Sequence, residues 1–160
     1  MIKTIGIVGM VSAMVLAFAL AGKAETYEGG FVRIAPDSVK WSDIPDGHGA
    51  QIAVLQGDPS KPGLYVIRVK FPPHVMSTPH THPEDRHATV IKGTWYTGTG
   101  ATFDPAKTVA LKTGSYMLHP GGALHWDGAA KDEEVIVQIM GIGPSGTSAL
   151  NPAEAWAKVK

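Results

Sequence analysis

Cysteine is absent from the 160 residues, and neither sign of charge is in excess, with 14 Lys and Arg against 14 Asp and Glu. The missing thiols exclude disulfides, thiolate metal ligands, a thiol nucleophile and a lipid-modified N-terminal cysteine. Because nucleic acids and anionic membranes favour a basic surface, the even charge balance argues against either as the main partner. The chain also lacks a Gly-x-Ser-x-Gly elbow and a Walker-type loop, so a Ser-triad hydrolase or phosphatase has no support.

The first two dozen residues have the three parts of a secretory signal peptide. Lys3 precedes a run without charge from 5 to 21, and the small residues Gly22 and Ala24 lie just before Glu25. We predict a signal peptide over 1–24, a mature domain over 25–160, and no stable membrane insertion after cleavage, which makes the protein periplasmic or secreted. Cleavage after Ala21 is a second option. A retained anchor is the alternative, because the run has the minimum length for a bilayer span.

The rest of the chain is rich in turns, with most of the 19 Gly and 12 Pro separating short β-prone runs. These runs include residues 31–34, 51–55, 64–71, 88–91, 94–97, 109–112, 115–118 and 134–142. Short strands at this spacing predict an all-β fold, an antiparallel β-sandwich closed into a barrel. A short C-terminal helix is predicted over 153–159, with Asn151 as its cap and Pro152 in its first turn.

Three histidines form a candidate metal site. His80 and His82 are two residues apart, so on an extended segment both side chains project to the same face. His125 follows a strand and a Pro-Gly-Gly turn, which would place it on an antiparallel neighbour facing the pair. Either element alone is weak, because exposed loop histidines are common. Together they predict a site for a divalent metal ion.

These elements resemble the two motifs of the cupin superfamily over about residues 66–141. His80, His82 and Gly93 fit the first motif, and Gly114, Pro120, Gly122 and His125 match the second at the required spacing. The resemblance implies a single cupin-type, RmlC-like jelly-roll domain that holds a divalent metal through a histidine cluster. Within the superfamily, the chain most resembles small exported single-domain cupins. The resemblance also implies a homodimer formed through edge strands.

Three positions depart from the family pattern. The Glu ligand of the first motif falls on Arg86, its opening Gly falls on Pro73 or His74, and the Asn that closes the second motif falls on Ala129. Arg86 has no lone pair for a metal. A fourth donor would come from His87 or Glu84 if the bend at Pro83 shifts the register, or from water. Alternatively, Arg86 turns inward and anchors the carboxylate or phosphate of a ligand.

Two main functional hypotheses follow. In the first, His80, His82 and His125 hold Fe, Mn, Ni or Zn, and the protein acts on a small molecule as an oxygenase, isomerase or lyase. In the second, the protein is a non-catalytic small-molecule-binding module that uses Arg86 as an anion anchor. A third hypothesis is a sensor that resembles the cupin halves of metal-binding anti-sigma proteins. Predicted export argues against a direct transcriptional partner for it.

Overall fold

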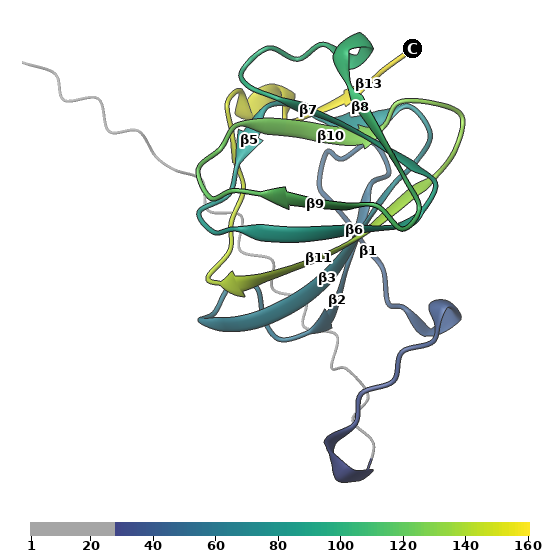
Figure 1. The fold of residues 1–160 in the computed structure, drawn as a ribbon, viewed down its shortest axis with the longest axis vertical. Helices are drawn as coiled ribbons and strands as arrows, with labels where there is room; N and C mark the ends of the chain where they lie inside the picture. Colours follow the sequence, from purple (N-terminus) through teal and green to yellow (C-terminus); the bar gives the residue numbers. More distant parts are fainter. Residues whose placement is uncertain (1–27) are drawn as a thin grey trace, which may run out of the picture.

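The computed structural model describes residues 28–160, and strands dominate this part of the chain (Figure 1). The predicted signal peptide therefore lies outside the described residues. The strands are β1 Ser42–Asp43, β2 Gln51–Gln56, β3 Gly63–Phe71, β4 Val75–Ser77, β5 His80–Thr81, β6 Arg86–Lys92, β7 Thr94–Thr99, β8 Val109–Lys112, β9 Tyr116–His119, β10 His125–Ala129, β11 Val135–Gly143, β12 Ser148–Ala149 and β13 Trp156–Lys158. Four short 3-10 turns accompany them: η1 Glu28–Gly30, η2 Pro36–Ser38, η3 Pro105–Lys107 and η4 Pro152–Glu154.

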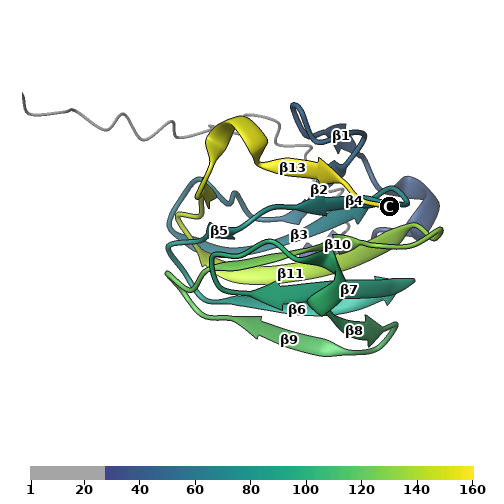
Figure 2. The ribbon, with the colours of Figure 1, turned by 90° about the horizontal axis from the view of Figure 1, so that it is seen from above.

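All the strand pairs are antiparallel, and they form two sheets that face each other (Figure 2). The first sheet has the order β1-β2-β3-β11-β6-β9. In the second, β10 is the hub: β4 and β5 pair with its two ends, β7 pairs along most of its length, and β8, β12 and β13 extend the sheet from β7, β5 and β4. This arrangement confirms the predicted all-β sandwich.

The core lies between the sheets and follows from the alternation of side chains along the strands. On β11, Val135, Val137 and Ile139 are buried at every second position, and they contact partners from both sheets, such as Tyr65 on β3 and Trp95 on β7. Because one face of each strand packs into this core, the register of each strand is fixed. A residue two positions from a core residue is therefore held facing inward.

The helix expected at the C-terminus is not formed. Pro152–Glu154 makes one turn of 3-10 helix, as the Asn-Pro start suggests, but Trp156–Lys158 is a strand that pairs with Val75–Ser77. The Trp156 ring contacts the Phe71 ring, with 5.9 Å between their centroids. Pairing with β4 satisfies the backbone of this segment in place of helical hydrogen bonds, and the tertiary contact outweighs the local propensity. In the part of the chain described here, no helix has the length and hydropathy of a membrane span.

Candidate metal centre

The three histidines singled out by their spacing meet inside the barrel. His80 on β5 is paired directly with His125 at the start of β10, and His82 follows two residues after His80. Their ring centroids are 4.4 Å (80–125), 5.1 Å (82–125) and 4.8 Å (80–82) apart. All three are buried, and one ring nitrogen from each lies within 4.8 Å of those from the other two.

The turn between β9 and β10 holds this arrangement together. The backbone N–H of Gly122 donates to the carbonyl of His82 over 2.7 Å, which ties the turn to the segment that carries the first two histidines. Gly122 has φ +75°, a conformation that glycine adopts without strain. The glycine of the second motif therefore lets the turn reach His82, and His125 begins the strand three residues later.

Backbone carbonyls set the tautomer of each of these rings. The Nδ1 atoms of His80, His82 and His125 lie at hydrogen-bond distance from the carbonyl oxygens of Thr78, Gly146 and Ala123, at 2.7, 2.7 and 3.0 Å respectively. A carbonyl only accepts, so each neutral ring carries its proton on Nδ1 and its lone pair on Nε2. Three Nε2 lone pairs therefore converge, as the imidazole ligands of a divalent ion require.

His119, at the end of β9, is a fourth buried histidine of the cluster. Its ring stacks on that of His125 with 3.9 Å between centroids, and the rings of Trp95 and His82 lie at 5.4 and 6.5 Å. Within the described residues, the two ring nitrogens of His119 have no hydrogen-bond partner, and Nε2 of His125 has none either. Because a buried polar atom without a partner is costly, a cation would be a favourable partner for these nitrogens.

A buried carboxylate completes the cluster. Asp127 lies two residues after His125 on the same strand, and its Oδ2 is 4.0 Å from His125 Nε2. Its Oδ1 accepts a hydrogen bond from Trp95 Nε1 over 3.3 Å. The ligand atoms of His119, His125 and Asp127 form a second group within 4.8 Å of one another, and this group shares His125 with the first. The cluster thus offers up to five donors, all nitrogen or oxygen.

Burial keeps His80, His82 and His119 neutral, because it lowers the pKa of each ring. It lowers the pKa of His80 from 6.5 to about 3 and that of His119 to about 2, with the neighbouring His125 adding to both shifts. The pKa of His82 is lowered further, by burial first and then by the Arg86 charge. Burial has the opposite effect on an acid and raises the pKa of Asp127. Neutral imidazoles are the form that binds metal.

Arg86 turns inward and reaches the cluster. Its Nη1 is 3.1 Å from His82 Nε2, its Nε donates to Glu84 Oε1 over 2.9 Å, and its Nη2 donates to Ser145 Oγ and to the Gly146 carbonyl. Both ion-pair side chains are about one-tenth exposed. Glu84 Oε1 also accepts a hydrogen bond from the Tyr65 hydroxyl. The guanidinium is therefore already matched by a carboxylate and held by the loop after β11.

His87 lies outside the cluster. Residues alternate along β6, so with Arg86 facing inward His87 is exposed on the outer face, where its Nδ1 lies 2.8 Å from the Tyr116 hydroxyl. The register shift that would make His87 a donor does not occur, because Arg86 pairs with His119 and His87 with Leu118 in the β6–β9 ladder. Glu84 is ion-paired with Arg86. The donors that join His125 are His119 and Asp127 instead.

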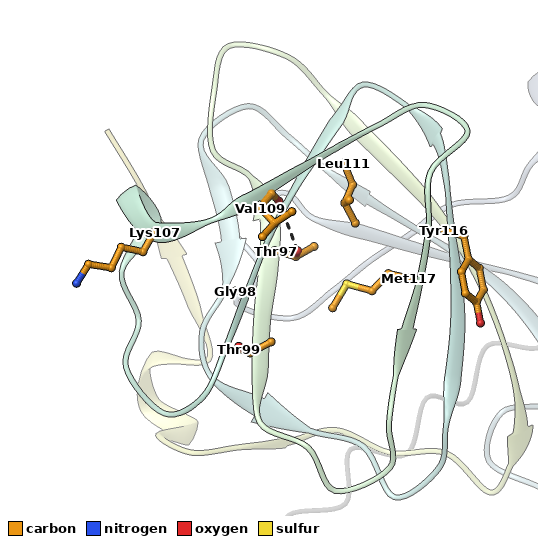
Figure 3. Close-up of a pocket in the computed structure, with 8 residues that line it drawn as sticks. All are labelled: Thr97, Gly98, Thr99, Lys107, Val109, Leu111, Tyr116 and Met117. Atoms are coloured by element: carbon orange, nitrogen blue, oxygen red, sulfur yellow. Dashed lines mark hydrogen bonds between the residues drawn. The ribbon is translucent and has the colours of Figure 1, made fainter.

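An open groove lies between the edges of the two sheets, beside the cluster. It has a volume of about 320 Å³, and it is lined by Thr97, Gly98, Thr99, Lys107, Val109, Leu111, Tyr116 and Met117 (Figure 3). Met117 lies two residues before His119 on β9, and Thr97 is paired with Asp127 on β10. Two of the lining residues thus lie on, or pair with, the strands that carry His119 and Asp127, and the walls of the groove are mostly apolar.

Comparison with known proteins identifies the family. The model of the ChrR cupin-like domain matches residues 30–144, so the chain belongs to this cupin family. A germin-like protein of Mesembryanthemum crystallinum is 32% identical over 96 residues, which cover 56% of this chain and 39% of that protein. The chain therefore spans about two fifths of the length of this curated relative.

Solved structures show the same fold. The polyketide cyclase RemF of Streptomyces resistomycificus superposes with a TM-score of 0.65 at 15% identity, over 78% of this chain and 89% of that chain. A putative ethanolamine utilization protein Q of Salmonella typhimurium gives 0.59 at 20% identity, over 74% and 91%. At these identities the likeness concerns the fold alone.

Two members of the cluster were not among the ligands predicted from the sequence, although each had a signal. His119 is two residues after Met117 in a β-prone run, so alternation would have placed it on the same face as that apolar residue. Asp127 lies two residues after His125 on an extended segment. This is the same spacing that marked His80 and His82 as a pair. Their role depends on which face of each strand is buried, which the structure supplies.

Proposed function

We propose that the protein is an exported cupin that binds one divalent transition metal ion and acts on a small molecule that enters through the groove. His80, His82 and His125 are the proposed ligands, with His119 as the fourth. The observation that carries the proposal is the convergence of three Nε2 lone pairs whose Nδ1 protons are held by backbone carbonyls. Such second contacts orient metal-binding histidines and increase their basicity.

The donor set restricts the metal. Neutral imidazoles, without a thiolate and with a single carboxylate nearby, suit Fe, Mn, Ni or Zn better than Ca or Mg, which prefer oxygen. When bound, such an ion supplies Lewis acidity or a binding position for O2. We place the protein among cupins of the oxygenase, isomerase or lyase type on this basis.

The residues around the cluster have separate tasks in this proposal. The carbonyls of Thr78, Ala123 and Gly146 hold the imidazoles in one orientation. The apolar walls of the groove, formed by residues such as Leu111 and Met117, admit the carbon skeleton of a substrate and exclude water from its inner end. Asp127, with its raised pKa, is placed to hold or give up a proton beside His125.

The alternative of a metal-free binding module rests on Arg86 as an anion anchor. In the structure Arg86 is paired with Glu84 and donates to His82, Ser145 and Gly146. An anion would have to compete with the Glu84 carboxylate for Nε and with His82 for Nη1. The metal-dependent function is therefore better supported by the contacts around Arg86.

Metal analysis of the purified protein tests this proposal. We expect about one transition-metal ion per chain, and its loss in the double variant His80→Ala/His82→Ala. His87→Ala is the matched control, because it removes a histidine from the same stretch of sequence but from the outer face, and it should keep the metal. Absence of metal from the unaltered protein, even after reloading with each candidate ion, would refute the metal-dependent function.

A further inference from the structure

Arg86 and a metal ion require the same lone pair. Arg86 Nη1 lies 3.1 Å from His82 Nε2, and the Nδ1 of this ring faces the Gly146 carbonyl, so Nε2 accepts the hydrogen bond from the guanidinium. A nitrogen lone pair is given either to an N–H group or to a metal ion. A guanidinium N–H is thus the partner of the Nε2 lone pair of one proposed ligand.

Loss of that contact leaves Arg86 with an N–H that needs an acceptor. The side chain is buried, and its other contacts, to Glu84, Ser145 and Gly146, involve Nε and Nη2. A buried donor without a partner is energetically costly. When His82 turns its lone pair to an ion, Nη1 therefore becomes a free donor at the edge of the cluster.

The charges favour an anion as the new acceptor. Glu84 matches the charge of Arg86, and Asp127 is the one further carboxylate that contacts the described cluster. A divalent ion would therefore leave the buried site with net positive charge, even with Asp127 ionised. Buried charge is stable only when it is paired. A small anion would both neutralise the site and accept from Nη1.

We propose that Arg86 forms an anion-binding subsite that opens when His82 binds metal, so that metal and a small carboxylate bind cooperatively. This inference rests on the proposed function, and it names the substrate class as small molecules that carry one carboxylate, because one buried guanidinium nitrogen is released. The coupling is reciprocal, because bound metal increases the affinity for the anion by the same factor as the bound anion increases the affinity for the metal. Arg86 is then a binding residue whose contacts depend on metal occupancy.

Cobalt(II) and benzoate are suitable probes, with neutral benzamide as the matched control ligand. Metal-free protein is titrated with cobalt by absorption and calorimetry, alone and with either ligand. We expect benzoate to tighten cobalt binding about fivefold or more, within the usual range of coupling between sites. Benzamide should have no such effect. Benzoate should bind only weakly without cobalt.

The double variant Glu84→Gln/Arg86→Gln removes the ion pair as a unit, which spares the fold an unpaired buried charge. It should bind cobalt at least as tightly as the unaltered protein, with the benzoate coupling reduced to about one. Arg68→Gln is the control, because this arginine is on β3 and contacts Gln138; it should keep the coupling.

The two proposals fail in different ways. If cobalt binds but benzoate leaves its affinity unchanged, or if the double variant retains the full coupling, the inference about Arg86 is wrong and the metal site stands. The inference is equally overturned if benzoate binds as tightly without cobalt. If neither cobalt nor any candidate ion binds, the proposed function fails and the inference fails with it.

Discussion

The ring of His119 stacks on that of His125 at 3.9 Å, while the two nitrogens of His119 are buried without a hydrogen-bond partner among residues 28–160. The ring of His119 therefore contributes to stability through stacking, whereas its nitrogens are suited to metal binding. Stacking would be served equally well by an apolar ring, so the nitrogens reduce the stability of the metal-free fold. If bound metal increases the stability of the folded protein through these nitrogens, the presence of a histidine at position 119 is explained.

The first prediction concerns His119→Phe. The substitution keeps an aromatic ring against His125 and Trp95 and removes two unpartnered buried nitrogens. We expect the metal-free protein to gain about 1 kcal/mol of unfolding free energy or more, and metal affinity to fall about tenfold or more through loss of a ligand. Urea denaturation and a metal titration measure the two effects.

The opposite signs make this test specific. A purely structural His119 would lose stability on substitution and leave metal affinity unchanged. His87→Phe, on the exposed face of β6, should alter neither quantity by much. If His119→Phe retained metal affinity, His119 would not be the fourth ligand.

The second prediction concerns Gly98, which lines the groove. In the structure the face of Gly98 packs against the Trp126 ring, and a Cβ at this position would overlap that ring. Gly98→Ala should therefore destabilise the protein by about 1–3 kcal/mol or more, because overpacking forces buried side chains to move. Thermal denaturation measures the change. Gly146→Ala is the control, since no atom lies within 4 Å of its Cβ position; equal loss in both variants would contradict this explanation.

Much of the fold and three of the five donors of the cluster followed from the sequence. The alternation along β3 and β11 and the Gly and Pro turns were sufficient for an antiparallel sandwich, because periodicity of two is a property of the local chain. The motif spacings identified His80, His82 and His125. Each of these conclusions depends on residues close together in the sequence or on a turn that joins neighbouring strands.

The errors have one physical cause, which is pairing between distant segments. Trp156–Lys158 is a strand because Val75–Ser77 lies beside it, and local propensity contains no information on that partner. The inward face of β6 is decided by its ladder with β11 and β9, which turns Arg86 to the cluster and His87 to solvent. Sequence parity alone left these two residues undecided.

The third prediction concerns the N-terminus, for which the three-part pattern at residues 1–24 is the support. Expressed in a Gram-negative host, the protein should be recovered from the periplasm with Glu25 as its first residue, because signal peptidase cleaves after a small-x-small triplet. Fractionation and N-terminal sequencing measure both. The substitution Leu16→Lys interrupts the apolar run, and the variant should remain uncleaved in the cytoplasm. Recovery of the unaltered chain with residues 1–24 attached in the membrane would support the anchor instead.

The fourth prediction concerns the pH dependence of the metal-free protein. The pKa values of His80 and His119 fall from 6.5 to about 3 and about 2 on folding, and that of His82 is also lowered. Below pH 6.5 the unfolded chain therefore binds protons that the folded chain does not. Each of these histidines then reduces the folding equilibrium constant about tenfold per pH unit. The stability is fully present above pH 6.5 and is lost as the pH falls.

Asp127 has the opposite sign, because its raised pKa lets the folded state take up a proton before the unfolded state does. It offsets at most one of the three histidines, so the net effect remains a loss of stability on acidification. Urea denaturation of metal-free protein between about pH 7.5 and about pH 5 measures the slope. His119→Phe should reduce that slope by the share of one histidine, whereas His87→Phe should leave it unchanged. Stability independent of pH over this range would mean that the buried histidines take up protons in the folded protein.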